Sequence, residues 1–272
     1  MKRQLTTPLL AVLLLCSTAV FSQFIQAKNS AALSLRGAYA MQKQTIDSGN
    51  GAEAMNTTQL KIYTDKYMMY AHRRSATDSM AEFGVGTYKV ENGKIFENVF
   101  FSANGPQNNA FELAISKLGD GYRQVIDFPS DNSGKHFILT EDYKNASNKM
   151  VSPLDGAWKL VALMYADKNG NEMKVDLDEQ TGQYKFYESG HFMWGNRWKD
   201  KAGKMYTGYG YGTFRMTGPD AAAEYNESST YTTALVGKTM NLNLKFTGND
   251  RYQQTIVSAD GTKQIETYER LK

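Results

Sequence analysis

The sequence predicts an all-β protein made of two tandem up-and-down antiparallel β-barrels. Three observations predict this class: an internal repeat along the chain, alternation of side chains with period two inside the repeated segments, and turn residues at strand-like spacing. The expected organisation is a signal peptide at residues 1–22, a first, diverged barrel at residues 30–145 and a second barrel at residues 151–272.

The first expected element is an export signal. Two basic residues, the only charges before Lys28, precede an apolar run at residues 9–21. This run is shorter than the ~20 apolar residues that a membrane helix needs, so we expect a signal peptide and no integral membrane span. Cleavage is expected after Ser22, with Ala27 as a second usable site. Because Cys16 does not follow a small residue, an outer-membrane lipoprotein is disfavoured, and we expect a periplasmic or secreted protein.

Composition restricts the classes of function. The chain carries 31 basic and 28 acidic residues, and its single cysteine lies within the predicted signal peptide. Because the signal also removes two basic residues, the mature chain is close to neutral, and we expect no nucleic-acid partner. Without cysteine it has no disulfide, so packing alone must stabilise it. Extracellular animal domains of this kind usually carry disulfides, which favours a bacterial envelope protein.

An internal repeat links the two halves of the chain. Similar segments recur in the same order, and the offset between partners grows by only a few residues at each step, which indicates a duplication with small loop insertions. The matched segments are residues 35–39 with 154–158, 59–63 with 183–187, 69–71 with 193–195, 84–89 with 210–215, and 122–126 with 252–256.

The repeated segments have the alternation of half-buried strands. Tyr184 and Phe186 fall on one face, and Lys185 and Tyr187 fall on the other. Turns rich in Asn, Asp and Gly separate such runs and predict a meander. Many short antiparallel strands would leave open edges, so closed barrels are expected. The only helical turn that we expect lies at residues 176–179.

Two short elements in the second copy resemble the lipocalin-like domains of bacterial envelope proteins, within the calycin superfamily. They are Gly-Ala-Trp at residues 156–158 and Gly-His-Phe-Met-Trp at residues 190–194. The resemblance implies that Trp158 plugs the closed end of a barrel and that Arg270, on the last strand, lies across it. The first copy departs from this pattern, because Tyr39 replaces the tryptophan and its last strand offers no arginine.

Aromatic side chains are concentrated in the second copy and predict its binding site. Buried tyrosine hydroxyls and indole N–H groups need partners, which suits a barrel with a partly polar lining. For any single ring, core packing or a cover over the barrel end is the competing interpretation. The predicted ligand-binding residues are Trp194, Trp198, Tyr206, Tyr209, Tyr211 and His191.

No motif for catalysis or cofactor binding is present in the sequence. Gly208, Gly210 and Gly212 alternate along an expected strand, where glycine permits bending or close packing, and they do not open a helix as a phosphate-binding loop would. The three histidines have no ligand spacing, so we expect no metal site and no cofactor.

Three classes of function therefore remain open. The first is a noncatalytic binding or scaffold module that holds a small apolar or amphipathic ligand in the second barrel; the sequence indicates no protein partner. The second is a structural or interaction module, which filled barrels would favour. The third is a calycin-like isomerase or hydrolase, which a cavity containing a buried carboxylate or histidine would favour.

Overall fold

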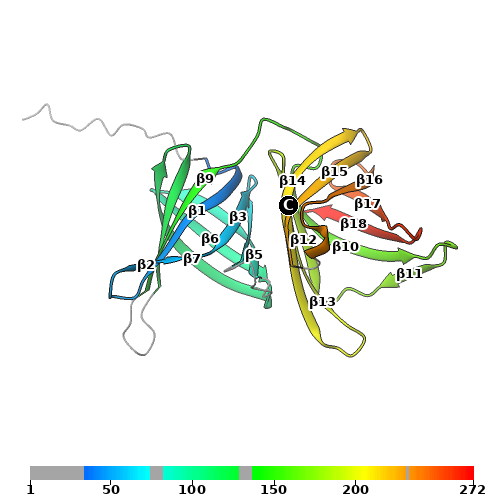
Figure 1. Ribbon diagram of the computed structural model, residues 1–272, viewed down its shortest axis with the longest axis horizontal. Helices are drawn as coiled ribbons and strands as arrows, with labels where there is room; N and C mark the ends of the chain where they lie inside the picture. Colours follow the sequence, from blue (N-terminus) through cyan, green and yellow to red (C-terminus); the bar gives the residue numbers. More distant parts are fainter. Residues whose placement is uncertain (1–33, 74–81, 129–136, 231–232) are drawn as a thin grey trace, which may run out of the picture. The chain divides into compact units, whose positions relative to one another are not determined.

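The computed structural model describes four ranges of the chain, residues 34–73, 82–128, 137–230 and 233–272 (Figure 1). The predicted signal peptide lies outside them. The one helix in these ranges is the short 3-10 helix η1 (Thr233–Leu235). The helical turn expected at residues 176–179 is wrong, because Asp178 Oδ1 accepts the backbone N–H groups of Gln180 and Thr181 and forms a local turn.

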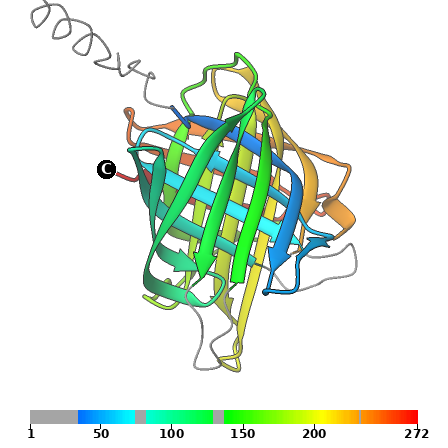
Figure 2. The same cartoon turned by 90° about the vertical axis from the view of Figure 1, so that its left-hand side faces the viewer.

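The first sheet closes into an eight-stranded barrel. Successive strands from β3 to β9 pair antiparallel, β1 pairs with β3, and β9 returns to pair with β1, while the short β2 pairs with the far end of β1. Figure 2 shows β1 (blue) beside β9 (bright green). The strands are β1 (Gly37–Asp47), β2 (Ala52–Met55), β3 (Thr58–Tyr63), β4 (Tyr67–Arg73), β5 (Glu82–Glu91), β6 (Lys94–Ser102), β7 (Gly105–Leu118), β8 (Gly121–Phe128) and β9 (Phe137–Asn145).

The second sheet repeats this topology. Its order is β11-β10-β12-β13-β14-β15-β16-β17-β18, and β18 pairs with β10 to close the barrel. The strands are β10 (Gly156–Ala166), β11 (Glu172–Val175), β12 (Gly182–Glu188), β13 (His191–Lys199), β14 (Met205–Gly218), β15 (Ala221–Ser229), β16 (Thr239–Phe246), β17 (Arg251–Val257) and β18 (Lys263–Arg270). The predicted class, two tandem up-and-down barrels, is therefore confirmed.

Irregularities of the strands also repeat between the barrels. The register shifts between Leu160 and Ala162 in β10, and it shifts at the corresponding place in β1. A second shift lies beside Gly212 in β14, where an added Cβ would come within 1.9 Å of the Tyr225 backbone oxygen. Bulges bend a strand and increase its twist, which a closing sheet requires. The expected close packing at Gly212 is thus confirmed.

The base of the second barrel carries the tryptophan and arginine that the lipocalin-like resemblance implies. Trp158 is fully buried, and its Nε1 donates to the Leu154 carbonyl at 2.7 Å. The Arg270 guanidinium lies 4.1 Å from the centre of the Trp158 ring, and its Nη1 donates to the Asp155 carbonyl at 2.7 Å. The arginine thus links the last strand to the first strand of the same barrel.

In the first barrel, tyrosines occupy the corresponding place. Tyr39 is buried and meets the rings of Tyr122 and Tyr63 edge-on, with centroid distances of 5.0 Å and 6.0 Å. Edge-to-face packing of several rings fills the end of the barrel without a tryptophan.

Strand β12 is buried on both faces, which corrects the half-buried pattern expected for it. Lys185 and Tyr187 belong to the barrel interior, where they contact Glu224. Tyr184 and Phe186 belong instead to an apolar cluster that includes residues of both sheets. One face of the strand therefore packs inside the barrel while the other packs outside it. Independent folding of the two copies stays a prediction.

Candidate functional site

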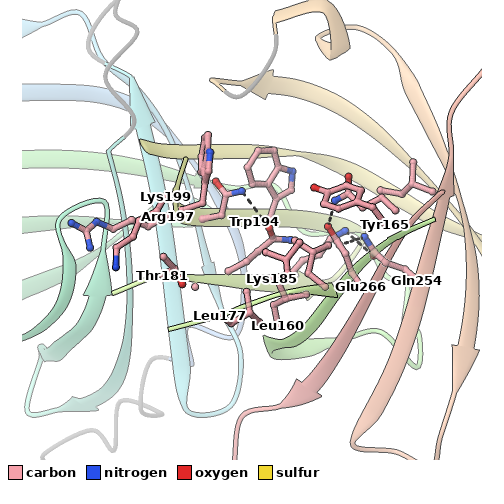
Figure 3. A pocket seen from close by; sticks show the side chains of 18 of the residues that line it. Leu160, Tyr165, Leu177, Thr181, Lys185, Trp194, Arg197, Lys199, Gln254 and Glu266 are labelled. Carbon is pink, nitrogen blue, oxygen red and sulfur yellow. Dashed lines mark hydrogen bonds between the residues drawn. The ribbon is translucent and has the colours of Figure 1, made fainter. Parts of the chain in front are cut away.

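The second barrel contains a cavity of about 470 Å³ (Figure 3). Its lining residues come from strands β10 to β13 and β15 to β18 and from the loops between them. Its volume is within the usual range of small-molecule sites. The apolar part of the wall is formed by Leu160, Leu163, Val175, Leu177, Met240 and Ile256.

A buried ionic network forms the polar part of the wall. Lys185 Nζ lies 2.8 Å from Glu224 Oε1 and donates to Gln254 Oε1 at 3.1 Å. Gln254 Nε2 in turn donates to Glu266 Oε2 at 2.5 Å. All four residues line the cavity and are almost completely buried. Burying these charges is tolerable because each contacts an opposite charge or a hydrogen-bond partner.

A chain of hydrogen bonds extends from Glu266 to a second polar position. The Tyr268 hydroxyl donates to Glu266 Oε2 at 2.7 Å and is contacted by Gln183 Nε2. Gln183 Oε1 then accepts from Asn196 Nδ2 at 3.3 Å. Asn196 Oδ1 is buried and has no hydrogen-bond partner among the described residues. Burial, followed by the nearby Glu266 charge, raises the pKa of Tyr268 well above its ordinary value, so its hydroxyl keeps its proton.

The first barrel contains the same ionic network. Lys61 Nζ lies 2.6 Å from Glu97 Oε1 and 3.4 Å from Gln124 Oε1. Gln124 Nε2 contacts Glu141 Oε2, which also accepts from the Tyr143 hydroxyl at 2.9 Å. Because both barrels have it, the network belongs to the duplicated fold as well as to the cavity.

The sequence patterns above do not predict these network residues. The sequence nonetheless contains a pattern that indicates them, in the matched segments 59–63 and 183–187. Their first, third and fifth residues are identical (Gln, Lys and Tyr), while the second and fourth differ. In a strand these identical residues share one face. An inward polar face could therefore have been found from the repeat.

Two of the predicted ligand-binding residues, Trp194 and Trp198, line the cavity. Trp194 lies opposite Gly210 on the neighbouring strand, and a Cβ at that glycine would be 2.6 Å from Trp194 Cε2. The indole ring thus covers the bare backbone of β14. The same arrangement occurs in the first barrel, where the Tyr70 ring covers Gly84. The glycine fixes where the cavity-lining aromatic ring can lie.

Tyr206 lies next to this wall but does not line the cavity. Its ring stacks on Trp198 at a centroid distance of 5.7 Å, and its hydroxyl donates to Asp200 Oδ2 at 3.1 Å. The side chain is 36% exposed, so it supports Trp198 from the solvent side.

Tyr209, Tyr211 and His191 lie on the opposite face of their strands from the cavity. The rings of Tyr209 and Tyr211 stack at 6.1 Å and belong to or pack against the apolar cluster outside the barrel. His191 is buried, its Nδ1 lies 3.4 Å from the Ser189 carbonyl oxygen, and burial lowers its pKa. Because strand side chains alternate, Trp194 faces inward while His191 faces outward.

Charges near the rest of the lining are paired at the surface. Lys199 Nζ contacts Asp178 Oδ2 at 2.6 Å, and this bond holds the pKa of Asp178 below its usual value. Arg197 Nη1 donates to the Gln180 carbonyl at 2.7 Å. Lys199 and Asp178 thus neutralise each other and Arg197 is bound to a backbone carbonyl, whereas the buried network holds one lysine against two glutamates.

Within the four described ranges, no group of His, Cys, Asp or Glu side chains has the arrangement of a metal site. No helix in the same ranges is long and apolar enough to span a membrane.

Comparisons with known proteins give distant structural likenesses only. No family model matches the chain, and no curated protein matches it. A lipocalin-like protein from Bacteroides uniformis is 16% identical with a TM-score of 0.29, and the match covers 44% of this chain and 100% of that one. An uncharacterised protein from Saccharomyces cerevisiae is 12% identical with a TM-score of 0.41, over 86% of this chain and 98% of that one. A protein of the DUF3598 family from Nostoc punctiforme is 12% identical with a TM-score of 0.27, over 87% and 96%.

Proposed function

We propose that the protein is an exported, noncatalytic binding module that holds a small amphipathic ligand in its second barrel. The observation that carries this proposal is the cavity of about 470 Å³, with aliphatic walls, two tryptophans and a few converging polar groups. Sites for small molecules have this composition: apolar area supplies affinity, and a few polar groups orient the ligand. A filled barrel, as expected of a purely structural module, would lack this space.

Buried carboxylates in the cavity are also the feature expected of an enzyme. Here, however, Glu224 is contacted by Lys185 and by the Tyr187 hydroxyl. Glu266 accepts hydrogen bonds from Gln254, among others. A general acid or base must exchange protons with a substrate, and carboxylates held this way in both barrels serve the fold instead. We therefore favour binding over catalysis.

Filling the cavity tests the proposal. Ile256 lines the cavity, and a tryptophan at this position would occupy space that a ligand needs. The next residue, Val257, is 51% exposed, so Val257→Trp adds the same side chain outside the cavity. We expect the neutral apolar dye N-phenyl-1-naphthylamine to bind the wild-type chain and Val257→Trp with enhanced fluorescence, and Ile256→Trp to bind at least about tenfold more weakly.

Dye binding that is equal in the two variants would place the site elsewhere, and absence of dye binding to the wild-type chain would argue for a structural module. Native mass spectrometry of protein purified from its source adds an independent measurement, because a bound small molecule should appear as a discrete added mass.

A further inference from the structure

The hydrogen-bond chain from Glu266 has a fixed direction. A carboxylate only accepts, so the single hydroxyl proton of Tyr268 is donated to Glu266. The tyrosine oxygen must then accept from Gln183 Nε2, which leaves Gln183 Oε1 to accept from Asn196 Nδ2. The orientation of the Asn196 amide follows, and its Oδ1 is the end of the chain. This buried oxygen has no donor among the described residues.

The Asn196 oxygen lacks a hydrogen-bond donor, which a ligand could supply. Asn196 is one of the residues that line the cavity. Its oxygen has almost no exposed surface, so the amide must turn towards the cavity to accept from a bound molecule. Leaving a buried acceptor without a donor costs free energy, and a ligand that supplies the donor recovers it. Each link of the chain also polarises the next one, so the Glu266 charge strengthens Asn196 Oδ1 as an acceptor.

The first barrel satisfies the corresponding position by itself. There, His72 stands opposite Gln59, as Asn196 stands opposite Gln183, and His72 Nε2 contacts Glu82 Oε2 on the neighbouring strand. In the second barrel the residue across from Asn196 on that strand is Gly208, which has no side chain to offer. Divergence between the copies has thus replaced a contact between two side chains with a buried acceptor on a residue that lines the cavity.

The buried charge favours a cation as the donor. Lys185 is the one basic residue in the network, whereas Glu224 and Glu266 are both acidic. A buried excess of negative charge attracts a positive group more strongly than an exposed one does, because water screens it less. The ring of Trp194 lines the same cavity, and aromatic faces attract ammonium groups.

We propose that the ligand class is the amphipathic amine: an ammonium group donates to Asn196 Oδ1, and an aliphatic body contacts the apolar wall. This inference rests on the proposed binding function of the second barrel, and it adds the chemistry that selects the ligand.

Three probes with the same alkyl chain separate the inference from the function on which it rests. Decylammonium, decanol and decanoate, each below its micelle concentration, are titrated against the full mature chain at neutral pH by calorimetry and tryptophan fluorescence. Hydrogen bonds from charged donors are about twice as strong as neutral ones, so we expect decylammonium to bind about tenfold more tightly than decanol. Decanoate should bind most weakly, because it carries no donor and is repelled by the carboxylates.

Variants locate the interaction. Asn196→Leu keeps the size of the side chain and removes the acceptor, so decylammonium should bind about tenfold more weakly while decanoate is unaffected. Asn243→Leu makes the same change at an exposed position of β16 and should leave all three affinities unchanged. Glu266→Gln removes the charge at the start of the chain, and the preference for decylammonium over decanol should fall several-fold.

Each outcome has a distinct meaning. If decanol binds as tightly as decylammonium to the wild-type chain, the inference is overturned and the binding function stands. If none of the probes binds, the proposed function itself is overturned. Preference for decylammonium that survives in folded Asn196→Leu would assign the cation to another group and contradict the role of this acceptor. The ranking of the probes on the wild-type chain requires no variant, so it decides the ligand class even if a substitution prevents folding.

Discussion

Removing the lysine of the second-barrel network should destabilise the protein far more than removing a lysine from a surface ion pair. Lys185 and Glu224 are 3% and 4% exposed and lie 2.8 Å apart, whereas Lys199 and Asp178 are 39% and 49% exposed and lie 2.6 Å apart. The two pairs have similar geometry and differ in burial. They are therefore a matched comparison within one barrel.

The expected magnitudes follow from burial. Lys185→Met leaves the Glu224 carboxylate buried without its cation, which typically costs about 3–5 kcal/mol. Lys199→Met removes an exposed pair whose attraction is screened by water, so it should cost little. With a urea dependence of about 3 kcal/mol per molar, the first change should lower the unfolding midpoint by about 1 M or more, and the second should lower it far less.

Urea unfolding followed by far-ultraviolet circular dichroism and tryptophan fluorescence measures both changes. Adding Glu224→Gln to Lys185→Met removes the uncompensated charge and keeps an acceptor for the Tyr187 hydroxyl, so it should restore much of the loss. Equal destabilisation by Lys185→Met and Lys199→Met would refute the argument, as would a double variant no more stable than Lys185→Met alone.

Three further predictions concern single side chains of the second barrel. Gly210→Ala should displace the Trp194 ring, because the added Cβ would lie 2.6 Å from it, and should destabilise the barrel by about 1–3 kcal/mol. The tryptophan emission spectrum should shift, and an unchanged spectrum would contradict this. Arg270→Met should lower the free energy of unfolding in urea by about 2–3 kcal/mol, because it removes the cation over Trp158 and its hydrogen bonds. A change near zero would show that the arginine does not stabilise the barrel. Burial lowers the pKa of His191 in the folded state, so the unfolded state takes up the proton first, and stability should fall as the pH drops from about 6.5 towards the folded pKa. His191→Asn should reduce this dependence of stability on pH, and an identical slope would exclude the histidine as its source.

The sequence predicted the barrels because the fold depends on features that leave a local pattern. Strand alternation, turn residues and the repeat are all visible in short segments, and together they require closed sheets. The pairing of Trp158 with Arg270 was implied by the resemblance to lipocalin-like domains, which short elements at residues 156–158 and 190–194 carry. The contact of these two side chains at the barrel base confirms the prediction.

The residues that line the cavity were predicted only in part, because alternation assigns residues to two faces without identifying the inner one. In an ordinary barrel the apolar face would be inside, and in β12 this reasoning fails. Tyr184 and Phe186 pack outside the barrel, while Lys185 faces the cavity. The same ambiguity brought Tyr209 into the predicted site, although its ring lies outside. Which face is inside depends on contacts between distant strands, and no short segment contains that information.

Closure of each barrel by its first and last strands has a consequence for how the chain can acquire its structure. In the second barrel β10 has an exposed edge until β18 is available to pair with it, so the sheet cannot close until its final strand has formed. Pairings between strands so distant in sequence form slowly. A chain that stops short of β18, whether during synthesis or by proteolysis, would carry two open sheet edges and should aggregate or be degraded. Loss of β18 alone is therefore expected to prevent closure of the whole second barrel.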